Sequence, residues 1–459
     1  MLGKDLASDI FDRIRKLSSA DEVEAIFYGG RSALTRFANN TIHQNVAEEN
    51  VAVSVRTVFG GGTARASTNK FDDESLRRVV SASESLARVQ EPDPDLLPMI
   101  SAGESLAATP LNRYFEQTAA VTPEVRAEGV GEIVGIAKKN GLTTAGIFSS
   151  SEQMEGIFNS RGLARWHAQT SSEISITMLA ADSSGWQKAN SPDVNVLDAS
   201  RLAEVAAEKA RMSAAPKEIP AGKYTVILEP AAVLDIVGFM FFDFGGLAIL
   251  DQRSFLNGRV GKKIFGDNID IWDDVGHPLQ SNAPFDGEGV PRQRVQLVEK
   301  GVVKRLVYAR GTAERMKKSD YKDSVGPIEV TGHGFPIPNE MGEAPMNIVF
   351  ATAANPKTTE QMIASTERGV LVTRLWYIRE VDPYEKILTG MTRDGTFYVE
   401  NGKIQYGIRN FRFNESLLHM LSNVEEMGVP VRASGEESFD MVAPAMKVAG
   451  FNFTEVTKF

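Results

Sequence analysis

The chain contains no cysteine among its 459 residues. This absence excludes disulfide bonds, thiol nucleophiles and metal sites built on thiolates, and it is compatible with a reducing compartment. Histidine is scarce as well, because only five are scattered along the chain and no two have the spacing that places a pair of ligands on one face of a helix. The donors that metallohydrolases commonly use are therefore absent or isolated.

Clusters of basic residues are also missing. The formal net charge is −10, and a general nucleic-acid surface needs grouped Lys and Arg to neutralise phosphates, so we expect no direct nucleic-acid binding. The first residues lead into an amphipathic segment without an apolar signal-peptide core, which favours a cytoplasmic protein. The most apolar stretch, residues 231–250, is interrupted by Asp235, Asp243 and a Gly pair, so we expect it to be buried core and no membrane span.

Hydrophobic periodicity predicts an α+β protein of two domains. Residues 1–215 alternate helical and strand patterns, and they predict a mixed domain of helices and antiparallel sheet with subregions at about 1–92 and 110–215. Small and helix-breaking residues gather at Ala214-Ala215-Pro216, where we place the boundary. Residues 216–459 consist of many short strand patterns, which predict a barrel-like or sandwich β domain.

Several local signals define individual elements. Strands at 32–37 and 42–48 are predicted to pair around an Asn39-Asn40 turn. Thr122 and Pro123 begin a helix that ends at Gly141, and this helix contains the glycines at 129–135, so they are no dinucleotide-binding loop. Residues 224–228 read as a strand that runs into a buried helix over 228–242, with Pro230 in its first turn.

Several ordered blocks along the chain carry a resemblance to a known family. They include residues 35–44, 51–56 and 64–69, Asn159-Ser160-Arg161-Gly162-Leu163, residues 219–226, Arg253-Ser254-Phe255-Leu256, Val260-Gly261-Lys262-Lys263 and residues 399–404. In this order they resemble the TldD/PmbA family, known as modulators of DNA gyrase. The resemblance covers nearly the whole chain and implies a closing helix over residues 417–428. It implies that one of two related subunits carries H-E-x-x-x-H on the helix after Pro230, with a further metal ligand from a C-terminal cysteine.

The corresponding window in this chain lacks that motif. It reads Asp235, Ile236, Val237, Gly238, Phe239 and Met240. A hydrolytic zinc site needs imidazole, thiolate or carboxylate donors and a carboxylate that activates water, whereas this window offers one carboxylate and no imidazole. We therefore expect no catalytic residue, no cofactor and no metal in this chain, and we interpret the helix as structural.

The resemblance places this chain on the PmbA/TldE side of the family. It implies a non-catalytic subunit of a metallopeptidase complex that cleaves unfolded proteins or peptides, with zinc only in a TldD-like catalytic partner. A heterodimer with that partner or a homodimer is expected. Two alternatives remain open, namely a homo-oligomeric hydrolase with an unrecognised metal site and a non-enzymatic peptide-binding or assembly protein.

Two residue sets are candidates for such an unrecognised site. Glu229, Asp235, Asp243 and Asp251 lie close together in sequence, and converging carboxylates can perform acid–base chemistry or hold a hard cation. His277 or His333 is a possible imidazole donor, although Gly- and Pro-rich surroundings favour loop positions for both. For the carboxylates we favour the alternative that each is a cap or boundary residue satisfied by its own hydrogen bonds.

Overall fold

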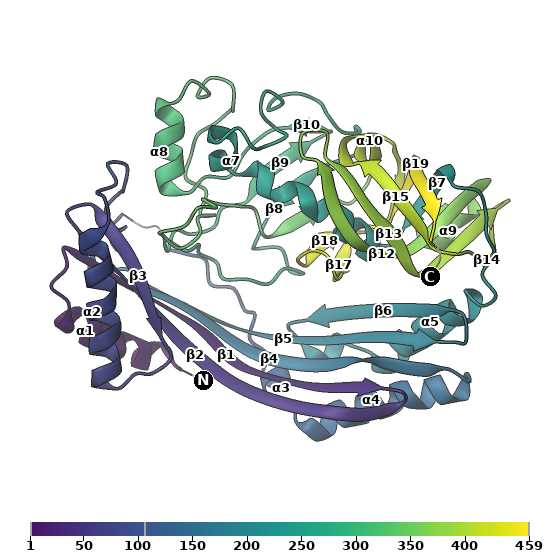
Figure 1. Ribbon diagram of the computed structural model, residues 1–459, viewed down its shortest axis with the longest axis horizontal. Coiled ribbons are helices and arrows are strands. Elements are labelled where there is room, and N and C mark those ends of the chain that lie inside the picture. The colour runs from purple at the N-terminus through teal and green to yellow at the C-terminus, as the bar shows by residue number, and fades with distance from the viewer. Residues whose placement is uncertain (1, 105–106, 458–459) are drawn as a thin grey trace.

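The computed structural model describes residues 2–104 and 107–457 (Figure 1). Its N-terminal half is built on one antiparallel six-stranded sheet with the order β3-β2-β1-β4-β5-β6. The strands are β1 (Glu22–Ala38), β2 (Thr41–Phe59), β3 (Gly62–Thr68), β4 (Thr143–Asn159), β5 (Ala164–Leu179) and β6 (Ser184–Ser191). The sheet is long and strongly curved, and its concave face looks toward the C-terminal half (Figure 1).

The long hairpin of β1 and β2 forms where the sequence predicts it. Asn39 and Asn40 both adopt positive φ, at 51° and 59°, which is the backbone that a two-residue type I′ turn requires and that Asn tolerates. The strand predicted at 32–37 is the second half of one longer strand, β1, whose pairing with β2 and β4 continues through Gly29 and Gly30.

Helices cover the other face of this sheet. The helices are α1 (Lys4–Leu17), α2 (Asp73–Val89), the short α3 (Glu116–Ala119), α4 (Pro123–Lys139) and α5 (Ala199–Met212). Two apolar clusters join them to the strands, one under α1 and α2 and the other under α4 and α5. The Thr122 hydroxyl accepts from the Val125 N–H, and Pro123 occupies the first turn, so α4 begins as predicted.

The C-terminal half contains a closed five-stranded barrel, which confirms the predicted α+β class and strand-rich C-terminal region. Its strands run in the order β12-β7-β19-β15-β13, and pairing of β12 with β13 closes it. The barrel strands are β7 (Gly222–Leu228), β12 (Arg368–Asp382), β13 (Ile387–Glu400), β15 (Phe411–Ser416) and β19 (Met446–Val456), with β14 (Lys403–Gly407) and β16 (Val424–Met427) paired at its margins.

A second sheet packs with the barrel around one large apolar core. Its strands are β8 (Ile271–Asp273), β9 (Val295–Glu299), β10 (Val302–Val303), β11 (Ile348–Phe350), β17 (Val431–Ala433) and β18 (Met441–Ala443). The helical elements are α6 (Pro230–Val237), the 3-10 helix η2 (Gly238–Phe244), α7 (Gly246–Leu250), α8 (Arg310–Lys318), α9 (Thr359–Ala364) and α10 (Leu417–Ser422), with the 3-10 turn η1 (Val194–Val196) in the N-terminal half.

Two predicted helices are shorter than expected. The helix predicted over 417–428 stops at Ser422, because residues 424–427 pair with β19 as strand β16 and so satisfy their backbone groups in the sheet. The helix predicted over 228–242 is α-helical only as far as Val237 and continues as the 3-10 helix η2. In the described part of the chain, no helix has the length and apolarity needed to cross a membrane.

Candidate functional site

The helix α6 begins at the end of a barrel strand. Strand β7 pairs in parallel with β12, and the Glu229 N–H, directly after β7, donates to the Val372 carbonyl oxygen at 3.1 Å. Pro230 follows as the first helical residue, where its missing N–H costs no hydrogen bond. The strand-to-helix connection thus fixes α6 against the barrel and directs residues 235–240 into the C-terminal core.

Asp235 is fully buried and anchors a distant loop. Its Oδ1 accepts hydrogen bonds from the backbone N–H groups of Glu436 and Glu437, at 2.9 and 3.0 Å, while its Oδ2 has no partner among the residues described. Burial raises the pKa of Asp235 to about 6, and the two backbone hydrogen bonds act in the opposite direction. The carboxyl group therefore acts as a structural acceptor for the loop of residues 434–440, which we call the sealing loop.

The sealing loop lies directly against the window. A Cβ atom added to Gly238 would lie 1.8 Å from the Ser438 hydroxyl oxygen, and one added to Gly435 would lie 2.1 Å from Oδ1 of Asp235. Both distances are far below van der Waals contact, so any larger side chain at either position forces the loop and the helix apart. Gly238 also marks the change from α6 to η2.

The remaining window positions belong to the apolar core. Ile236, Val237 and Met240 have no exposed surface, and Phe239 packs against the same cluster from a half-buried position. Ile236 stands where a water-activating carboxylate is required, and its aliphatic side chain neither accepts a proton nor binds a cation. Met240 offers only a soft, uncharged thioether.

The residues present do not fit a hydrolytic zinc ion. The one carboxylate, Asp235, already accepts two N–H donors, and such donors compete with a cation for the same lone pairs. Among residues 2–104 and 107–457, no group of three or more His, Cys, Asp or Glu side chains is arranged to hold a metal ion. The chemistry of this donor set provides neither a complete ligand sphere nor a general base.

The other carboxylates of the acidic set do not converge on one point, because each has a partner of its own. Glu229 pairs with Lys209 at 2.7 Å, and Asp251 pairs with Arg253 at 3.2 Å on the surface. Asp243 is buried and pairs with Lys386 at 2.6 Å, and burial raises its pKa against the effect of that lysine.

The two candidate histidines lie in separate structural settings. His277 accepts from the Leu279 N–H at 3.2 Å within a turn. His333 is buried, with Nε2 at 2.9 Å from an Asp273 carboxylate oxygen and Nδ1 at 3.0 Å from the Thr331 hydroxyl. Both ring nitrogens of His333 thus face protein groups. Neither histidine joins the helix window in a ligand set in the described structure.

Comparison with known proteins shows the family of this fold. Residues 221–455 match the PmbA/TldA metallopeptidase C-terminal domain, and residues 23–87 match PmbA/TldA metallopeptidase domain 1. The chain belongs to the PmbA/TldD family. The first of these matches alone spans half of the sequence, and together they reach both halves of the molecule.

Relatives in the family extend over most of the chain. Metalloprotease PmbA of Escherichia coli O157:H7 is 23% identical over 399 residues, which cover 84% of this chain and 82% of that protein. A PmbA homologue of Haemophilus influenzae is 22% identical and covers 91% of each chain. Both relatives carry the name metalloprotease.

Two solved structures share the fold. TldE from Thermococcus kodakarensis aligns with a TM-score of 0.85 at 18% identity, covering 98% of this chain and all of that one. A protein of Thermotoga maritima described as a modulator of DNA gyrase also has a TM-score of 0.85, at 21% identity and with 98% and 100% coverage.

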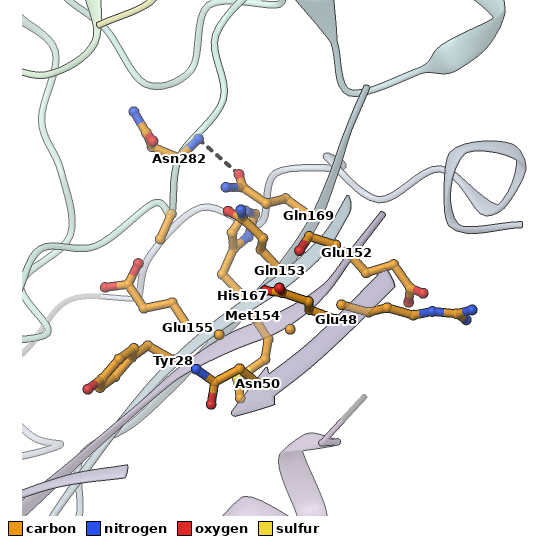
Figure 2. Close-up of a pocket in the computed structure, with 15 residues that line it drawn as sticks. Tyr28, Glu48, Asn50, Glu152, Gln153, Met154, Glu155, His167, Gln169 and Asn282 are labelled. Atoms are coloured by element: carbon orange, nitrogen blue, oxygen red, sulfur yellow. Dashed lines mark hydrogen bonds between the residues drawn. The ribbon is translucent and has the colours of Figure 1, made fainter. Parts of the chain in front are cut away.

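A second feature of this PmbA/TldD protein, a pocket on the N-terminal sheet, was not found from the sequence. It encloses about 400 Å³ and is lined from β1, β2, β4 and β5, with Asn282 and Ala283 contributed by the C-terminal half (Figure 2). Its residues are far apart in sequence and carry no motif. The available signal was strand alternation, which places Gln153 with Glu155, and His167 with Gln169, on one face once the strands are paired.

Proposed function

We propose that this chain is the non-catalytic subunit of a TldD/TldE-type metallopeptidase complex that cleaves unfolded proteins or peptides. One observation carries the proposal. The helix that holds H-E-x-x-x-H in a catalytic subunit here presents Asp235, Ile236 and Met240, and the carboxylate is already bound by the sealing loop. The catalytic metal and its general base then come from a TldD-like partner.

The close packing of the sealing loop against the helix supports this interpretation as well. Gly238 approaches Ser438 so closely that there is no room for a longer side chain at that turn of the helix. The helix and the loop therefore form one packed unit, and that unit stabilises the wall of the barrel. A subunit of this kind contributes by positioning its partner and by enclosing the substrate.

The curved N-terminal sheet is suited to enclosing the substrate. Its concave face is turned toward the C-terminal half, whereas its helices cover the opposite face (Figure 1). A partner placed against the open side of this arch completes a chamber that admits extended chains and excludes folded domains. We place the complex in the cytoplasm.

Reconstitution with a TldD-like protein from the same genome tests the proposal. The two chains are purified separately and together, zinc is measured per chain by mass spectrometry, and cleavage of an unfolded protein is followed for each sample. We expect a stable heteromeric complex, zinc only in the partner, and activity that requires both chains. The variant Asp235→Asn serves as the control in this chain and leaves the activity of the complex unchanged.

Other results would replace the proposal. Chelator-sensitive cleavage by this chain alone, with one zinc per chain, favours a homo-oligomeric hydrolase, as the name metalloprotease of its relatives suggests for those proteins. Peptide binding without a catalytic partner favours a non-enzymatic binding or assembly protein.

A further inference from the structure

The pocket on the N-terminal sheet exists because two adjacent glycines lie in β1. Gly29 has φ of +117°, and a Cβ atom there would lie 2.1 Å from the Asn50 carbonyl oxygen. A Cβ atom on Gly30 would lie 1.9 Å from the carbonyl oxygen of Glu152. The three strands therefore approach one another more closely than side chains allow, and the sheet has no side chain at the floor of the hollow.

Strand pairing decides which side chains face this hollow. Tyr28 lies opposite Glu155, which lies opposite His167, and in the next row Gln153 lies opposite Gln169. Side chains of one row point to one face of a sheet, so these five share the concave face. Figure 2 shows them around the pocket, with the Asn282 N–H donating to Oε1 of Gln169 at 3.0 Å.

The acid on this face has no direct hydrogen-bond or ion-pair partner among the described residues. Burial raises the pKa of Glu155, and the positive charge of Arg292 acts in the opposite direction. The side chain of Glu48, on the same face of β2, adds a second negative charge at the rim of the pocket. Arg31, which follows Gly30 in β1, also borders the pocket and carries the opposite charge.

An imidazole beside this acid has one uncommitted ring nitrogen. His167 lines the pocket, is only 7% exposed, and has an Nε2 atom without a hydrogen-bond partner within the described structure. Burial lowers the pKa of His167, against the effect of a hydrogen bond with Gln169, and the charge of Arg113 lowers it further, which favours the neutral ring. A buried polar atom without a partner costs free energy, and a ligand that supplies a donor removes this cost.

We propose that this pocket binds an organic cation, namely an ammonium group that a peptide carries at its amino terminus or on a basic side chain. The cation pairs with Glu155, and His167 with the amide oxygens of Gln153 and Gln169 accepts hydrogen bonds from the chain that carries it. A metal ion fits less well, because two strong donors do not complete a coordination sphere. The inference rests on the proposed function only for naming a peptide as the carrier.

Binding to the isolated full-length chain tests this site without any proteolysis. Fluorescence anisotropy is measured with three short alanine peptides labelled at the carboxyl terminus: one with a free amino terminus, one acetylated, and one acetylated with a single lysine. We expect the acetylated peptide without lysine to bind at least tenfold more weakly than the free-amine peptide. The lysine peptide distinguishes the two sources of the cation, because it binds tightly only when a side chain suffices.

Two matched variants locate the effect. Glu155→Gln keeps the shape of the side chain and removes its charge, so it should weaken binding of the free-amine peptide by about tenfold and leave the acetylated peptide unaffected. Glu173→Gln is the control, since Glu173 lies on the neighbouring strand β5, is not among the residues that line the pocket and pairs with Lys188 at 3.4 Å. It should bind like the unmodified chain.

Several outcomes overturn the proposal. These are equal binding of free and acetylated peptides, unchanged binding by Glu155→Gln, no binding of any cationic peptide at millimolar concentration, or Zn²⁺ that binds through Glu155 and displaces the peptide. The comparison of free with acetylated peptide needs no variant, so it holds even if Glu155→Gln folds poorly. A failure of the peptide-binding assay leaves the result of the reconstitution with a TldD-like partner unaffected. A failure of the reconstitution likewise leaves the peptide-binding assay unaffected.

Discussion

Substitution of Asp235 tests quantitatively the structural role that we assign to residues 235–240. Its carboxyl group is fully buried, and burial raises its pKa from 3.8 to about 6. We consider the substitution Asp235→Asn, which keeps the shape and keeps an oxygen to accept from the Glu436 and Glu437 N–H groups. The variant cannot titrate, so it isolates the pH-dependent contribution of one carboxyl group to stability.

The sign follows from proton linkage. Between pH 3.8 and about 6 the folded state holds a proton on Asp235 that the unfolded state has already released, so the free energy of unfolding falls as the pH rises through this interval. A pKa difference of about two units corresponds to about 3 kcal/mol at 1.36 kcal/mol per unit. The Asn variant does not lose this stability, so its free energy of unfolding increases relative to that of the native chain as the pH rises.

Urea unfolding of both proteins at several pH values from 4 to 8 measures the effect. At pH 4 we expect the variant to be less stable by about 1 kcal/mol, because its amide N–H₂ has no acceptor where Oδ2 lacks a partner. The difference should shift in favour of the variant by about 2 kcal/mol between pH 4 and pH 6 and level off above about pH 7. A difference that is independent of pH, or that shifts toward the native chain, refutes the assignment.

Three further predictions concern the same half of the molecule. Gly238→Ala should lower the free energy of unfolding by about 1–3 kcal/mol through its clash with Ser438, and adding Ser438→Gly should restore part of the loss in the same urea assay. Lys386→Met should destabilise by about 3 kcal/mol, because it leaves Asp243 buried without its cation, whereas Lys386→Arg should cost less. Dialysis of the isolated chain against a chelator should leave its melting temperature unchanged, and a clear decrease would show a bound structural metal.

The sequence predicts elements best where turn and cap residues allow only one local backbone conformation. The Asn39-Asn40 turn, the Thr122-Pro123 helix start and the strand before Pro230 all lie where they were expected, because turn and cap chemistry acts over a few residues. The missing donors of the window are equally visible, since residue type alone decides whether a zinc ligand exists.

Tertiary contacts account for the differences. The helix after Pro230 changes to a 3-10 helix at Gly238, where the chain packs against Ser438, a residue 200 positions away in the sequence. Nothing near Asp235 in the sequence indicates that its carboxylate accepts from the sealing loop, or that Lys386 neutralises Asp243. The pocket on the N-terminal sheet was missed for the same reason, because four separate strands supply its residues.

Three acids of this protein, Asp235, Asp243 and Glu155, differ in a way that separates structural groups from binding groups. Asp243 has a lysine, and Asp235 has two backbone donors and lies fully enclosed. Glu155 has no direct donor in the described structure and borders a cavity of about 400 Å³. A carboxylate without a direct partner beside the unpartnered Nε2 of His167 gains free energy when a cation with hydrogen-bond donors enters. The first place to look for a ligand of this protein is therefore the concave sheet, because the acids beside α6 already have their partners.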